Sequence, residues 1–214
     1  MATVKTSVFA KGNSLRCLIA SAALLCAASA WADPATDYVS ESSGKATIID
    51  LGDQFAVVFS NEVSTTITLT ALKPCSLMRS LVVGGGGAGG NTMGGGGGGG
   101  QVVASDDLHI VSTNDVITLT VGDGGAKGTG YYAGLQGGTS SLTLPDGTTI
   151  NAYGGGGGGG YSAAAPTANA DGEIGSGGGN GFGRATAPTK GTHYNYGNPG
   201  GLAQGGGGGA GAAG

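Results

Sequence analysis

Apolar residues alternate with threonines along parts of the chain, the pattern of β-strands with one buried face. Ile67 and Leu69 alternate with threonines in residues 65–72, and Ile117 does so in residues 116–121. A period of two places the apolar side chains on one face of a sheet. No stretch shows the 3.6-residue period of an amphipathic helix. The strands expected are residues 46–50, 54–60, 65–72, 77–83, 101–104, 116–121, 139–144 and 148–153.

Turn residues and glycine runs separate these strands. Pro145-Asp146-Gly147 predicts a hairpin between two of them. Residues 84–100 are nearly all glycine, and residues 154–160 are glycine alone. Further glycine-rich stretches follow in residues 175–183 and 205–209. The chain therefore alternates between apolar strands and glycine runs.

The glycine runs have two physical interpretations. Glycine-rich segments normally behave as flexible linkers. Packed polyglycine II helices are the alternative, because glycine lets backbones approach closely enough to hydrogen-bond one another. Apolar residues flank the run at 84–100 directly, and strands are interleaved with the runs, so the sequence favours an ordered bundle over residues 84–160. For residues 161–214 it leaves both interpretations open.

The N-terminus has the three parts of a secretory signal peptide. Basic residues precede an apolar stretch at residues 17–30, and Ala30-Trp31-Ala32 provides a small-x-small cleavage site. We expect cleavage after Ala32. A lipid anchor at Cys26 is the alternative, although bulky Leu25 precedes it. Cleavage leaves Cys75 as the one cysteine, either buried or an intermolecular handle.

The order of strands and glycine runs resembles a known glycine-rich domain family. Leu81-Val82-Val83 followed by glycine, residues 117–126 and Ala152-Tyr153 followed by glycine carry the resemblance, which spans residues 77–214. Members occur in secreted bacterial and phage tail-fibre proteins, and a related arrangement occurs in anaplastic lymphoma kinase-type receptors. The resemblance implies a structural or ligand-binding role outside the cell and no catalysis. Related domains close with a further apolar strand, which a partner or a longer chain would supply here.

These observations predict an all-β fold. We expect a jelly-roll-like β-sandwich with packed polyglycine II helices and almost no α-helix outside the signal peptide. The expected organisation is a signal peptide at 1–32, a polar leader at 33–44, strands interleaved with polyglycine at 45–160, and a glycine-rich segment at 161–214.

Composition narrows the function further. Glycine accounts for 50 of the 214 residues, and the net charge is −4. The acidic balance argues against nucleic-acid binding. Glycine in runs rather than at every third residue excludes collagen. The signal peptide indicates an exported protein, secreted or at the cell surface of a bacterium, or periplasmic if retained, whereas the acidic charge offers solubility and little else.

Sequence motifs for catalysis, cofactor binding or metal binding are weak in this chain. Any polyglycine run contains the motif G-x-G-x-x-G, and here the motif lacks the βαβ unit that a dinucleotide-binding site requires. Lys127 lacks the neighbours of a phosphate-binding loop. His109 beside Asp106 and Asp107 fits a strand end better than a metal site, and His193 has no candidate co-ligands. We therefore predict no enzyme activity, no catalytic or metal-binding residues and no cofactor.

Aromatic residues at the ends of the glycine runs are the candidate binding residues. Rigid runs would hold tyrosines in loops, where they offer large contact area at low entropic cost. The alternative is that the rings only cap the bundle. The residues selected as a binding surface are Tyr131, Tyr132, Tyr194 and Tyr196.

The expected function is a non-enzymatic structural or adhesive module at or beyond the cell surface. The alternative is a ligand- or receptor-binding domain that uses the aromatic loops. The expected partner is a cell-surface or matrix component, or a second copy that pairs through an open sheet edge. An ice-binding surface of regular threonines is a third hypothesis.

Overall fold

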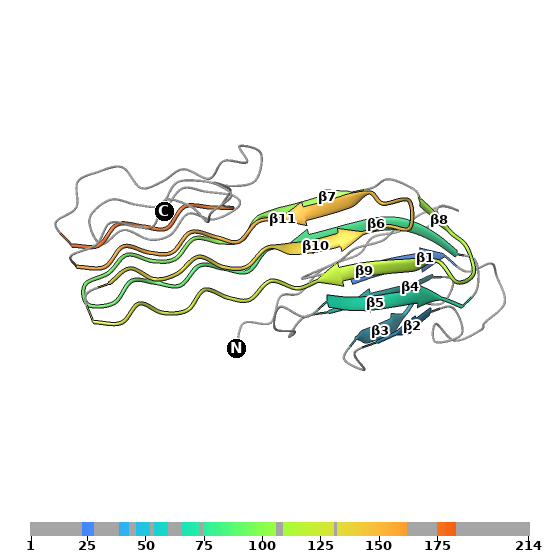
Figure 1. The fold of residues 1–214 in the computed structure, drawn as a ribbon, viewed down its shortest axis with the longest axis horizontal. Coiled ribbons are helices and arrows are strands. Elements are labelled where there is room, and N and C mark those ends of the chain that lie inside the picture. The colour runs from blue at the N-terminus through green and yellow to red at the C-terminus, as the bar shows by residue number, and fades with distance from the viewer. Residues whose placement is uncertain are drawn as a thin grey trace.

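The structure, a computed structural model, describes residues 23–27, 39–42, 46–51, 54–59, 66–72, 75–105, 109–130, 132–161 and 175–182 of the chain. Within these ranges the regular secondary structure is all β, in two antiparallel sheets. Glycine-rich runs extend from one end of the sheets as an elongated bundle (Figure 1). The predicted fold class is confirmed.

The first sheet has the strand order β3-β4-β1-β6-β7, and β8 pairs with another part of β6. All its pairings are antiparallel. β1 occupies the centre of this sheet, and β4 and β6 flank it on either side. The strands are β1 (Ala23–Ala27), β3 (Thr47–Asp50), β4 (Gln54–Val58), β6 (Cys75–Val83), β7 (Val102–Ser105) and β8 (His109–Val111).

The second sheet has the strand order β11-β10-β9-β5-β2 and is also antiparallel. Ile67 lies opposite Leu119, and Thr68 lies opposite Thr118, so aliphatic and threonine rows face opposite sides. The strands are β2 (Val39–Glu41), β5 (Thr66–Ala71), β9 (Val116–Thr120), β10 (Ser140–Thr143) and β11 (Thr149–Ala152).

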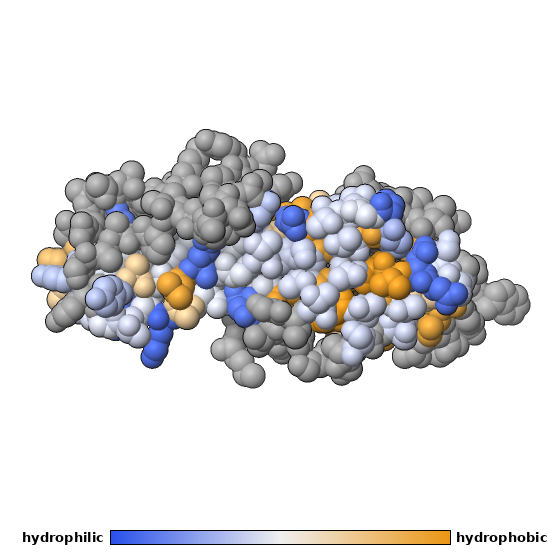
Figure 2. Space-filling view, in the orientation of Figure 1, coloured by the Kyte–Doolittle hydropathy of each residue, from blue (hydrophilic) through white to orange (hydrophobic). Residues whose placement is uncertain are grey.

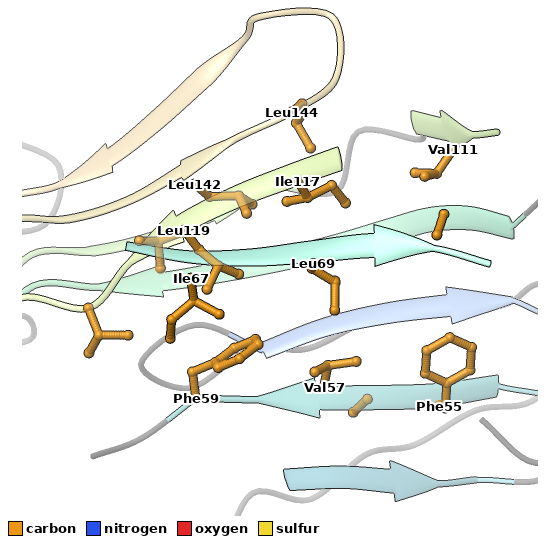
Figure 3. Close-up of a cluster of buried hydrophobic side chains, with 14 of the residues drawn as sticks. Phe55, Val57, Phe59, Ile67, Leu69, Val111, Ile117, Leu119, Leu142 and Leu144 are labelled. Atoms are coloured by element: carbon orange, nitrogen blue, oxygen red, sulfur yellow. The ribbon is translucent and has the colours of Figure 1, made fainter. Parts of the chain in front are cut away.

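The hydrophobic core lies between the two sheets (Figure 3). The aliphatic row of the second sheet packs against residues of β4 and Phe59. In β5, buried positions alternate with exposed or half-buried ones, as the sequence predicted. Burying each large apolar side chain contributes about 1.5–3 kcal/mol. The largest fully buried side chains are Phe55, Phe59, Ile67, Leu69, Leu119, Leu142, Val57 and Val82.

Three strands were missing from the sequence prediction. β2 falls within the expected polar leader, and β8 begins at His109, where only a strand end was expected. β1 falls within the apolar stretch predicted to be the core of a signal peptide. The predicted hairpin between β10 and β11 is present, with Gly147 at φ 86°.

The glycine bundle grows from the ends of the strands. β6 continues into residues 84–90, which run away from the sheets and return as residues 94–100 to β7. β9 and β10 are joined in the same way by residues 122–127 and 132–139, and β11 continues into residues 153–160 (Figure 1). A further run, residues 175–181, lies alongside 153–160.

Every third amide of a run donates to the same neighbouring run. Gly84 N, Gly87 N and Gly90 N donate across to the 94–101 segment, each at 2.9 Å. A three-residue period is that of a polyglycine II helix, which has no internal hydrogen bonds and needs lateral partners. The predicted packing of polyglycine runs is therefore present. The 153–160 run is bonded to 84–90, 94–101, 132–139 and 175–181.

Close packing in the bundle requires glycine where two backbones meet. A Cβ built at Gly157 would overlap the carbonyl oxygen of Gly134. At Gly124, on the edge of the bundle, the nearest atom to such a Cβ is 3.9 Å away. Positions within the bundle therefore differ sharply in their need for glycine.

Two buried polar side chains tie the bundle to the sheets. Gln101 Oε1 accepts a hydrogen bond from Tyr153 N at 3.0 Å. Ser140 Oγ donates to Val83 O at 2.6 Å and accepts from Gly122 N at 2.9 Å. Ser140 is 0% exposed. Each side chain therefore links runs that leave different strands.

Replacing Ser140 with alanine should destabilise the protein by about 1–3 kcal/mol, because the half-buried Val83 carbonyl and Gly122 amide lose their common partner. The measurement is the free energy of unfolding in urea. Ser141→Ala is the matched control, since Ser141 is the next residue of β10 and is half-buried. Equal stability of the two variants would contradict a structural role for the Ser140 hydroxyl.

Candidate functional site

Potential metal ligands do not cluster among the described residues. Among them, no three His, Cys, Asp or Glu side chains gather where they could hold a metal ion. His109 begins β8, while Asp106, Asp107 and His193 lie outside the described residues. Lys127 is exposed at the outer end of its run. The candidate site lies instead in the outer turns of the bundle.

The first turn at the outer end of the bundle joins the 84–90 and 94–100 runs. Thr92 and Met93 there have left-handed backbone angles, φ 47° and 51°. This conformation is uncommon for residues other than glycine, and for β-branched threonine it is a true outlier. Strained backbone of this kind persists where the surroundings hold it, and it concentrates at functional sites.

The second turn, between residues 128 and 132, packs against the first. Thr92 Oγ1 donates to Gly130 O at 3.1 Å, and Asn91 N donates to Tyr132 O at 3.2 Å. Gly130 itself has φ 60°. These hydrogen bonds join the two turns, so each turn restrains the backbone of the other. A single run could not restrain its own turn in this way.

Two aromatic rings complete this end of the bundle. Tyr161 ends the 153–160 run and Phe182 follows the 175–181 run. Their rings are stacked, with centroids 5.9 Å apart and planes 5° apart. Phe182 N also donates to Met93 O at 2.9 Å, so the ring pair adjoins the first turn.

We call Met93, Tyr132, Tyr161 and Phe182 the aromatic tip. All are exposed: Tyr132 by 69%, Met93 by 57%, Phe182 by 49% and Tyr161 by 45%. In Figure 2, apolar colouring is visible at the outer end of the bundle. Exposed apolar groups that adjoin one another mark a contact surface more often than scattered ones do. The tip offers flat rings and a flexible thioether on a rigid support.

The predicted site residues are only partly described. Tyr132 lies in the aromatic tip, whereas Tyr131, Tyr194 and Tyr196 lie outside the described residues. Met93 was missed because it reads as an interruption of polyglycine. Tyr161 and Phe182 lie near run ends in the sequence, but nothing in the sequence shows that their rings stack. The lateral alignment of the 153–160 and 175–181 runs places the two rings next to each other.

Comparison with known proteins identifies the family. The family model described as a glycine-rich domain matches residues 61–214, so the chain belongs to the glycine-rich domain family. No curated protein and no solved structure matches the chain. Within the described residues, no helix is long and apolar enough to cross a membrane.

Proposed function

We propose that this glycine-rich domain protein is an exported, non-enzymatic adhesive module that binds through its aromatic tip. The partner is a component of a cell surface or an extracellular matrix. The observation that carries the proposal is the convergence of Met93, Tyr132, Tyr161 and Phe182 on one exposed end of the bundle.

The physical support for binding is preorganisation. Tyrosine and phenylalanine have few rotatable bonds, so they bury large area at low entropic cost. The lateral hydrogen bonds of the bundle fix the turns that carry them. A rigid surface loses little conformational freedom on binding, which raises affinity for a given contact area. The resemblance to tail-fibre domains supports the same role.

Removing the rings should strongly weaken adhesion while the fold persists. We expect the double variant Tyr132→Ala/Phe182→Ala to bind more than about tenfold more weakly, as is usual for truncated hot-spot aromatics. The measurement is binding of the fluorescently labelled exported protein to a panel of intact bacterial and epithelial cells.

Leu135→Ala is the matched control, since Leu135 is 58% exposed but lies along a run rather than at the tip. It should bind as the parent does, and both variants should melt at the parent temperature. A double variant that binds normally, or a parent protein that binds none of the cells, would contradict the proposal.

A further inference from the structure

β1 has two roles that exclude each other. In the structure Ala23–Ala27 is the central strand of the first sheet, paired with β4 on one side and β6 on the other (Figure 1). In the sequence the same residues belong to the apolar stretch of a signal peptide, upstream of a cleavage site after Ala32. If export removes this stretch, the folded sheet loses a strand from its middle.

The missing strand would leave a defined gap. β1 pairs with both neighbours over its whole length, with Leu24 opposite Val57 of β4 and Ser80 of β6. Neighbouring strands lie about 4.8 Å apart, so β4 and β6 would face each other across about 9.6 Å. This distance is too long for direct hydrogen bonds. Backbone donors and acceptors on both strands would then need new partners.

The walls of the gap belong to the hydrophobic core. Phe55 and Val57 of β4, opposite Cys26 and Leu24, are 2% and 0% exposed, and Leu81 of β6, opposite Ala23, packs against the core. Opening the gap would expose apolar surface as well as backbone edges. A strand that refills it would satisfy hydrogen bonds on both of its edges, whereas a strand added to a sheet edge satisfies one.

We propose that the gap between β4 and β6 is an acceptor site for an extended apolar strand from a partner polypeptide. This inference rests on export with cleavage after Ala32. β1 is the example of a strand that fits this gap. Its sequence Ala-Leu-Leu-Cys-Ala contains no charge and no proline, and it runs antiparallel to both β4 and β6. The partner therefore presents at least five uncharged, mainly aliphatic residues in extended conformation.

The test uses the protein that cells export from the full gene. Its N-terminus is determined by intact mass, and its size is measured by analytical ultracentrifugation. A labelled peptide of residues 20–30, with lysines added at its ends for solubility, is then titrated by fluorescence anisotropy. The same peptide with Leu25→Pro is the control, because proline cannot donate in the middle of a sheet. The full chain made without export, which keeps β1, is the second control.

The expected result is a protein that begins at Asp33, binds the peptide and melts at a higher temperature with it. The proline peptide should bind at least about tenfold more weakly, and the unexported chain should bind neither. The proposal is overturned if the exported protein retains residues 23–27, or if it is a monomer that begins at Asp33 and does not bind the peptide. It is also overturned if a second copy of the chain fills the gap and prevents the peptide from binding.

The proposals for the acceptor site and for the aromatic tip can be contradicted independently of each other. Tyr132→Ala/Phe182→Ala alters the outer end of the bundle and none of the residues paired with β1. That variant should therefore bind the peptide as the parent does, whatever its adhesion to cells.

Discussion

Gly157→Ala should unfold the glycine bundle, whereas Gly124→Ala should leave its stability unchanged or slightly higher. At Gly157 the new methyl group meets the Gly134 carbonyl, so the 153–160 and 132–139 runs must separate. Overpacking alone costs about 1–3 kcal/mol, and occasionally more. Each lateral hydrogen bond lost adds about 0.5–1.5 kcal/mol. Gly134 N to Gly158 O, at 2.8 Å, is the first bond at risk.

Gly124→Ala is the matched control because it adds the same methyl group at another position of the bundle. There the methyl group finds its nearest neighbour 3.9 Å away. Alanine also restricts the unfolded chain, which stabilises by about 0.4–1 kcal/mol where the native backbone tolerates it. Thermal unfolding of both exported proteins is the measurement. Melting of the two variants at one temperature would refute close backbone packing at Gly157.

Amides inside the bundle should exchange with solvent about a thousandfold or more slowly than in a coil, since exchange must await opening of the bundle. Gly98 N donates to Gly156 O and Gly155 N donates to Gly85 O, both at 2.8 Å. The 154–160 glycines are buried throughout. Glycine in a flexible linker would have neither property.

Hydrogen exchange followed by mass spectrometry provides this measurement on the exported protein. Peptides from residues 84–100 and 154–160 should be protected to a degree similar to β5 and β9. Gly157→Ala should remove the protection from the bundle, while β5 keeps it. Exchange at coil rates in the parent protein would mean that the runs are spacers, and the aromatic tip would lose its rigid support.

Much of the sandwich could be predicted because its strands are strongly patterned. The alternation of Ile67, Leu69 and Ala71 with threonines predicts β5 and identifies its buried face, and the structure confirms both. β8 and β2 are each three residues long, too short for a period of two to stand out. Both are held by pairing with distant strands, β6 and β5.

The bundle could be predicted only where glycine is nearly pure. Leu135 and Gln136 interrupt the 132–139 run, so its composition resembles an ordinary loop. In the structure Leu135 is 58% exposed, which shows that a polyglycine II run accepts a large side chain on its outer side. The aromatic tip depends on which runs are neighbours. Its grouping therefore follows from the lateral hydrogen bonds and could not be read from Tyr132 or Phe182 alone.

The direct continuity between glycine runs and strands has a mechanical consequence. A force applied at the tip would load the backbones along their length, and the tension would pass through Gly84 into β6 and through Gly122 into β9 (Figure 1). The bonds between runs lie across this direction, so the tension does not peel the runs apart one bond at a time. Both sheets share the load from the start. The molecule is thus built to be stiff in tension along the axis on which an adhesive contact would pull.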